Sequence, residues 1–289
     1  ELTNAILRSY YIATGKVQLV RVPYYHNIKN DATLTCLPWD GNKGGILVFN
    51  VRDTFTMGAN INVNGRGFRG GNSVNNGTNA NACNQNNFTY PAGSVSAAAK
   101  GEGITSSAVP ASWGKGAETN AGGGGNGHNA GGAGGSNYGK GGFGGYQLIT
   151  CGNAPFDNRG IGGYPLQYSN AGNRIFMGGG GGSGHADNTG GSSMPGGNGG
   201  AIVIINSNFI QSNGYKILAN GADALQCTLS SFSDCYDAGG GGGAGGTVLI
   251  KNNTYITPVE VQANAGKGGD VIIYDPGANK DKIGPGGGG

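Results

Sequence analysis

One segment decides the fold: GGAIVIINSNFIQSNGYKILANG, residues Gly199–Gly221. It has a Gly-Gly entry, an apolar run at Ile202–Ile205, a polar turn, a second short apolar stretch and an Asn-Gly exit. Two more segments follow the same plan, Gly44–Gly65 and Gly245–Gly266, and a weaker copy lies at Lys16–Cys36. Apolar, β-branched runs bounded by glycine or asparagine are typical of strands buried on both faces. The plan therefore predicts a repeated strand unit.

The second strand of each unit alternates apolar and polar residues, at Ile61/Val63, Tyr215/Ile217 and Val259/Val261. A unit of this size cannot bury an apolar face alone, but stacked units share one continuous core. We therefore expect an all-β fold with almost no α-helix. Its scaffold is predicted to be β-solenoid-like or a β-sandwich, built from repeated strand pairs.

Glycine supplies 64 of the 289 residues and is concentrated in runs, chiefly Ala121–Gly145, Met177–His185 and Ala238–Gly246. Ordering a residue costs about 1–2 kcal/mol of backbone entropy, so such runs are either mobile or ordered by backbone hydrogen bonds. The runs are interrupted by larger side chains, and one motif occurs twice, as GGGGNGH at Gly122–His128 and as GGGGSGH at Gly179–His185. A flexible spacer has no reason to repeat a histidine.

Glycine segments held at both ends can form extended left-handed helices with three residues per turn and bond N–H to C=O on their neighbours. We expect the glycine-rich insertions to pack in this way, as polyglycine II-type helices; mobile loops are the alternative. The predicted organisation is one continuous domain with three parts. These are an N-terminal β scaffold at 1–65, a glycine-rich insertion at 66–198, and C-terminal β repeats with a glycine-rich tail at 199–289.

Several glycine-rich motifs occur in a fixed order: VNGRGFRGG (Val63–Gly71), KGEGI (Lys100–Ile104), the long run Gly122–Gly145, RIFMGGGGGSGH (Arg174–His185) and GGNGGAIVIIN (Gly196–Asn206). This pattern resembles the glycine-rich module of the very large, type IX-secreted surface adhesins of Bacteroidota, including gliding-motility adhesins. The architecture is also similar to the tip adhesins of certain tailed phages, in which glycine helices present receptor-binding loops. Both resemblances imply binding at an extracellular cell surface, and neither implies catalysis.

Candidate ligand-contact or bundle-capping residues lie where the glycine runs are interrupted. Exposed aromatic side chains stack on sugars and anchor protein partners, whereas histidines at the end of a bundle can cap backbone groups. The candidates are His128, Tyr138, Phe143, Tyr146 and His185. The two histidines lack a cysteine or acidic partner at metal-ligand spacing, so no metal or cofactor is predicted. Cys227 and Cys235 bracket a short polar loop and form a candidate disulfide.

No catalytic residues are assigned. The 15 acidic residues are scattered, whereas glycoside hydrolysis needs two carboxylates that face each other. A net charge of +3 gives little attraction for nucleic acid. No apolar stretch approaches the roughly 18 residues of a membrane span, so no membrane insertion is expected.

The sequence thus favours a non-enzymatic, extracellular adhesin or structural module. Its partners would be a surface glycan, a protein receptor or a solid surface, besides other parts of a larger surface protein or like subunits. Three alternatives stay open: a phage tail-tip receptor-binding adhesin, a self-assembling extracellular fibre subunit, and a polysaccharide-active β-helix enzyme.

Overall fold

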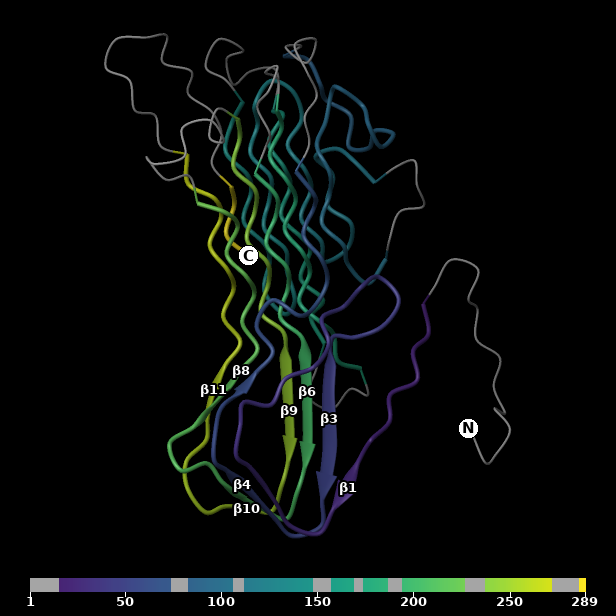
Figure 1. Ribbon diagram of the computed structural model, residues 1–289. Helices are drawn as coiled ribbons and strands as arrows, with labels where there is room; N and C mark the ends of the chain where they lie inside the picture. The colour runs from purple at the N-terminus through teal and green to yellow at the C-terminus, as the bar shows by residue number, and fades with distance from the viewer. Residues whose placement is uncertain are drawn as a thin grey trace.

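A computed structural model describes residues 16–73, 83–105, 112–147, 157–168, 174–186, 194–226, 237–271 and 286–289. These residues form eleven strands and no helix, and every pairing between strands is parallel (Figure 1). The all-β class predicted from the sequence is confirmed for this part of the chain.

The strands belong to three sheets. The first sheet has the order β1 (Tyr24–Tyr25), β3 (Ile46–Val51), β6 (Ile202–Asn206), β9 (Thr247–Lys251). The second has the order β10 (Thr254–Tyr255), β7 (Phe209–Gln211), β4 (Thr54–Met57), β2 (Ile28–Asn30). The third has the order β11 (Glu260–Gln262), β8 (Lys216–Leu218), β5 (Ile61–Asn62).

The chain passes through the three sheets in the same order three times, as β3–β4–β5, β6–β7–β8 and β9–β10–β11. The strands β1 and β2, with a bridge from Leu34 to Ile61, form an earlier and shorter pass. The register aligns corresponding positions of the passes, so that Ile202 pairs with Ile46 on one side and with Thr247 on the other. Each repeat segment in the sequence is therefore one pass through the three sheets.

The predicted unit of two strands is wrong in one respect, because each unit contains three. The additional strands β4, β7 and β10 follow two-residue corners at 52–53, 207–208 and 252–253. They are only 4, 3 and 2 residues long. Strands as short as these give too few residues for a period-2 pattern to be recognised, so in the sequence they merge with the polar turn.

The hydrophobic core lies between the three sheets. Its fully buried side chains include Phe55, Ile61, Ile210 and Ile217, and the Phe49 and Phe55 rings meet edge to face with centroids 5.1 Å apart. Burying each such side chain contributes about 1.5–3 kcal/mol. Because parallel register stacks apolar positions of successive passes, the core is continuous along the stack.

The glycine-rich segments lie beside one another beyond the amino ends of β3, β6 and β9 (Figure 1). The segment 178–183 illustrates their hydrogen bonding. Its first three N–H groups donate to three different segments, at the carbonyls of Gly200, Ser136 and Glu102. The next three N–H groups return to the same three segments, at Gly197, Ala133 and Ala99. Every third residue therefore faces the same neighbour.

The carbonyl groups of segment 178–183 follow the same period. They accept N–H groups from three further segments, at Phe68 and Gly71, Ala244 and Gly241, and Gly122 and Gly125. The segment thus has six hydrogen-bonded neighbours, three that accept and three that donate. We call this set of glycine-rich segments the glycine bundle. It satisfies the backbone groups that would otherwise be costly to bury.

Glycine is required in the bundle because the backbones approach too closely for a side chain. A Cβ atom added at Gly181 would lie within 3.0 Å of the carbonyl oxygens of Gly241 and Gly242. One at Gly199 would meet the carbonyl of Gly178. Segments of the C-terminal repeats also belong to the bundle, since Gly132 donates to Gly239 and accepts from Gly287.

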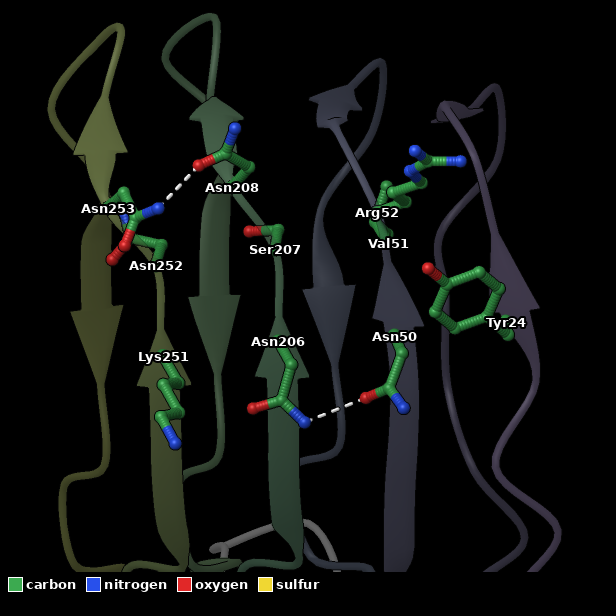
Figure 2. A pocket seen from close by; sticks show the side chains of 10 residues that line it. All are labelled: Tyr24, Asn50, Val51, Arg52, Asn206, Ser207, Asn208, Lys251, Asn252 and Asn253. Atoms are coloured by element: carbon green, nitrogen blue, oxygen red, sulfur yellow. Dashed lines mark hydrogen bonds between the residues drawn. The ribbon is translucent and has the colours of Figure 1, made fainter.

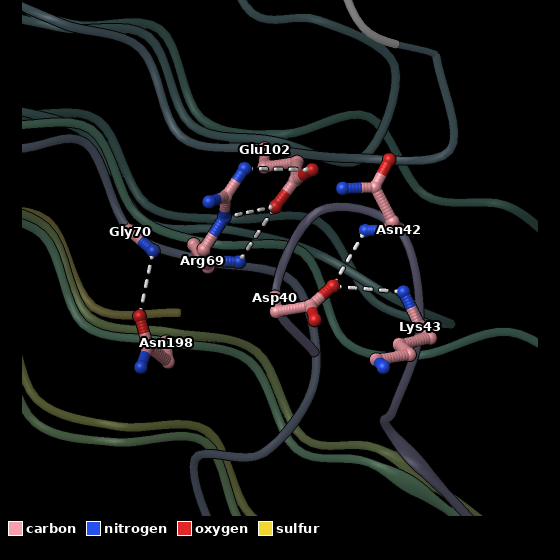
Figure 3. A network of polar contacts seen from close by, with 7 residues as sticks. All are labelled: Asp40, Asn42, Lys43, Arg69, Gly70, Glu102 and Asn198. Carbon is pink, nitrogen blue, oxygen red and sulfur yellow. Dashed lines mark hydrogen bonds and ion pairs between the residues drawn. The ribbon is translucent and has the colours of Figure 1, made fainter. Parts of the chain in front are cut away.

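Two polar contacts join neighbouring segments at the base of the bundle (Figure 3). The Arg69 side chain and backbone N–H both donate to the Glu102 carboxylate, with Nε–Oε2 at 2.9 Å. The N–H of Gly70 donates to the Asn198 side-chain oxygen at 2.8 Å. These contacts link segments far apart in the sequence at the point where the chain leaves the third sheet.

The loop at Asp40–Lys43 packs on the same base. The Asp40 carboxylate accepts the N–H groups of Lys43 and Asn42, and these bonds hold its pKa below its usual range. Gly41, with φ of +99°, lies against the Arg69 guanidinium, where an added Cβ would be 2.6 Å from the nearest nitrogen. Figure 3 shows the loop beside Arg69. The scaffold and the glycine bundle are therefore in direct contact.

Candidate functional site

An exposed stripe of side chains follows one segment at the edge of the bundle. Lys140, Phe143 and Tyr146 are exposed, with 43% of Phe143 and 41% of Tyr146 accessible. The buried residues Gly141 and Gly144 lie between them and donate to Gly163 and Gly160 at 3.0 Å. Because contacts repeat every third residue here, positions 140, 143 and 146 share one outward face. We call these three residues the aromatic stripe.

A cation from the neighbouring segment stacks on the aromatic stripe. The Arg159 guanidinium carbon lies 4.1 Å from the Tyr146 ring centroid and 4.9 Å from that of Phe143. Arg159 Nε also pairs with Asp157 at 3.1 Å, and Lys140 Nζ lies 4.9 Å from the Phe143 centroid. Such cation–π contacts hold the rings in place while one face of the stripe stays accessible.

Sequence reasoning identified Phe143 and Tyr146 but missed Arg159. The signal for the two aromatic residues was their position as interruptions of a glycine run. Arg159 lies on a separate segment, which the bonds from the Gly141 and Gly144 N–H groups to the Gly163 and Gly160 carbonyls set beside them. No spacing within one segment could have predicted that contact.

Tyr138 lies apart from the stripe, at the base of the bundle. Its ring is 67% exposed and meets Tyr168 edge to face at 5.9 Å, and Tyr168 in turn contacts Phe176 at 5.3 Å. The Tyr168 hydroxyl lies 3.0 Å from the Thr247 hydroxyl, at the start of β9. Tyr138 therefore sits on an anchored aromatic pair where the bundle meets the first sheet.

His185 is fully buried and contacts backbone groups. Its Nε2 lies 3.0 Å from the Val95 carbonyl oxygen, and its Nδ1 accepts the N–H of Asn129 at 3.3 Å. Both contacts join His185 to the backbone of other segments, and its assignment as a ligand-contact or bundle-capping residue stays a prediction. His128, next to Asn129, is partly buried. The two copies of the GGGG-x-G-H motif lie side by side, since the N–H groups of Gly122 and Gly125 donate to the carbonyls of Gly180 and Ser183.

The described ranges contain no group of three or more histidine, cysteine, aspartate or glutamate residues arranged to hold a metal ion. Of the cysteines in those ranges, Cys83 is disulfide-bonded and Cys36 is free. Burial raises the pKa of the Cys36 thiol. The candidate disulfide between Cys227 and Cys235 lies outside the described residues.

Two lysines inside the bundle were also not identified by sequence analysis. The Lys100 side chain is 3% exposed, and its Nζ lies 3.3 Å from a Glu118 carboxylate oxygen. Burial lowers the pKa of Lys100, although Glu118 offsets part of that effect. Burial likewise lowers the pKa of Lys115, which lies over the Phe88 ring at 5.5 Å. Their contacts are internal, so we assign them to the structure of the bundle and not to a site.

Within the same described residues there is no helix of the length and apolarity needed to cross a membrane. Comparison with known proteins finds no family model, no curated protein and no solved structure that matches the chain.

Proposed function

We propose that the chain is a non-enzymatic, extracellular cell-surface module, an adhesin or structural unit that binds glycans, partner proteins or surfaces. The observation that carries the proposal is the aromatic stripe. Two accessible rings, Phe143 and Tyr146, are held by Arg159 on a segment whose backbone is bonded to its neighbours. Aromatic rings of this kind stack on sugars and anchor protein partners.

The rigidity of the support favours binding. Ordering a flexible side chain at an interface costs about 0.5–1.5 kcal/mol, which lowers affinity. Here Gly141 and Gly144 are bonded to the adjacent segment, and Arg159 restricts the rings before any ligand arrives. Most of that cost is therefore met during folding.

We further propose that the three sheets form a β-solenoid and that the bundle consists of polyglycine II-type helices. The repeated passes in parallel register support a solenoid over a sandwich, because sandwiches are built from antiparallel strands. The three-residue period of the bonds from segment 178–183, and its six neighbours, support polyglycine II packing.

An extracellular location is consistent with the disulfide at Cys83, because disulfides persist mainly in oxidising compartments. The resemblance to type IX-secreted surface adhesins, including those of gliding motility, points to the same location. In that setting the chain would be one module of a larger surface protein and would serve cell adhesion.

The stripe variant Phe143→Ala/Tyr146→Ala tests this function. We expect it to bind glycan arrays and whole cells about tenfold to a hundredfold more weakly than the unchanged chain, because two central aromatic contacts are lost. The control is Tyr215→Ala, which removes a ring that is 39% exposed in the turn before β8. The control variant should bind normally.

Other results would favour other functions. Unchanged binding by the stripe variant would refute the role of the stripe. Shortening of a polysaccharide by the purified chain would contradict a non-enzymatic function. Concentration-dependent filaments in electron micrographs, without ligand binding, would favour a fibre subunit.

A further inference from the structure

A shallow groove of about 440 Å³ lies at the corner between the first and second sheets, where β3, β6 and β9 end (Figure 2). These strands run away from the glycine bundle, so the groove is at the end of the molecule remote from the bundle (Figure 1). It is separate from the aromatic stripe. We call it the corner groove.

Two pairs of asparagines cross the corner groove from one pass to the next. Asn206 Nδ2 donates to Asn50 Oδ1 at 2.7 Å, and Asn253 Nδ2 donates to Asn208 Oδ1 at 2.6 Å. Each bond uses one amide atom of each residue. Among the described residues, the other amide atoms of these four side chains make no hydrogen bond, and they line the groove. Figure 2 shows both pairs bridging adjacent strands.

Two further lining residues carry buried polar atoms without a partner in the described part of the chain, Ser207 Oγ and Asn252 Nδ2. Buried polar atoms in native proteins are nearly always hydrogen-bonded, because burial removes their bonds to water. The backbone of the corner groove therefore carries polar side chains whose bonding capacity is not used within the described residues.

The lining of the corner groove is positively charged. Its lining includes the cations Arg52 and Lys251 and no carboxylate. At one end lies Tyr24, 66% exposed, whose ring is directed toward the groove in Figure 2. An accessible ring next to amides and cations matches the chemistry of a sugar that bears hydroxyls and an acidic group.

We propose that the corner groove binds an acidic oligosaccharide, one that carries carboxylate or sulfate groups. The oligosaccharide lies across the strands, parallel to the direction in which the passes stack. The amides bond its hydroxyls, Arg52 and Lys251 pair with its acidic groups, and Tyr24 stacks on a terminal ring. Adjacent strands are about 4.8 Å apart, so the row Tyr24, Asn50, Asn206, Lys251 spans about 14 Å. This site goes beyond the stripe and does not depend on it.

The experiment is binding of the full chain to an array of uronate-, sialate- and sulfate-bearing oligosaccharides, each with its neutral counterpart. We expect binding to acidic members and little to neutral ones, and weaker binding as salt screens the charges. The groove variant Arg52→Gln/Lys251→Gln should bind about tenfold more weakly or worse, because charge-assisted hydrogen bonds are lost.

Two controls separate the groove from other effects. Lys216→Gln removes a surface cation outside the groove, paired with Glu260 at 2.8 Å, and should bind normally. The stripe variant Phe143→Ala/Tyr146→Ala should keep its binding to acidic oligosaccharides, even where it loses its other ligands. Circular dichroism of each variant verifies that it is folded.

Three results would overturn the proposal: no acidic oligosaccharide binds, acidic and neutral members bind equally, or the groove variant binds as well as the unchanged chain. A loss confined to the stripe variant would refute the corner groove but leave the proposed function standing. A loss of acidic-oligosaccharide binding confined to the groove variant is the expected result and supports the corner groove.

Discussion

Gly181→Ala is expected to destabilise the protein by about 4 kcal/mol or more, a large part of the roughly 5–15 kcal/mol of a typical domain. The added Cβ would meet the backbone of Gly241 and Gly242, and neither can give way as a flexible side chain could. Relief requires a shift of a segment, which breaks the bonds from Gly181 N–H to Gly197 and from Gly71 N–H to the Gly181 carbonyl. Each backbone group left buried and unpaired adds about 1–3 kcal/mol.

The matched control is Gly139→Ala. An added Cβ at Gly139 has nothing within 4 Å, and its φ lies outside the left-handed range, so its substitution should change stability by less than about 0.5 kcal/mol. Chemical denaturation of both variants and the unchanged chain measures the difference. If the Gly181→Ala variant were as stable as the Gly139→Ala variant, the close packing described for the bundle would be refuted.

Phe55→Ala should cost about 3–5 kcal/mol, since it removes a large side chain from the centre of the scaffold and leaves a cavity. Phe55 is fully buried, and its ring packs against that of Phe49 at 5.1 Å. The comparison is Tyr255→Ala, on β10. Tyr255 and Phe55 both pair with Ile210, one from each side. Tyr255, however, is 50% exposed, because β10 is the edge strand of its sheet.

The Tyr255 variant should lose less than about 1 kcal/mol, because its ring is already half in water. Denaturant midpoints with unchanged slopes give the two values. Equal losses would mean that the scaffold core is not centred on Phe55.

The strand repeats could be predicted because the signal is local. The apolar run Ile202–Ile205 located β6 at nearly its observed bounds, and the repeat segments Gly44–Gly65 and Gly245–Gly266 contain β3 and β9. The middle strands were missed because a strand such as Thr254–Tyr255 has no period of its own. Its place in the second sheet comes from pairing with β7, which is a long-range contact.

For the glycine runs, too, the sequence could not predict which segments pair. The duplicated GGGG-x-G-H motif indicated order, but glycine carries no side chain that would encode which segment lies beside which. The pairing of Gly178 with Gly200 follows from where the scaffold holds the ends of each segment. For the same reason Arg159 could not be assigned to the stripe, nor Asn50 and Asn206 to one groove.

The two proposed sites lie on different parts of the molecule. The stripe is presented by the bundle, and the corner groove by the opposite end of the scaffold. Both combine cationic side chains with accessible aromatic rings. This arrangement suits a module that contacts large, repetitive ligands at two places.

Amide hydrogen exchange across Gly178–Gly184 tests the central claim, a glycine bundle held by backbone hydrogen bonds, most directly. The N–H groups of Gly178 through Gly184 each donate to a carbonyl of a neighbouring segment. Exchange there should be slow, with protection approaching that of β6 in the scaffold, and Gly122–Gly145 should be protected wherever its N–H groups are bonded. Exchange of Gly178–Gly184 at the rate of an unstructured chain, while β6 stays protected, would contradict the account.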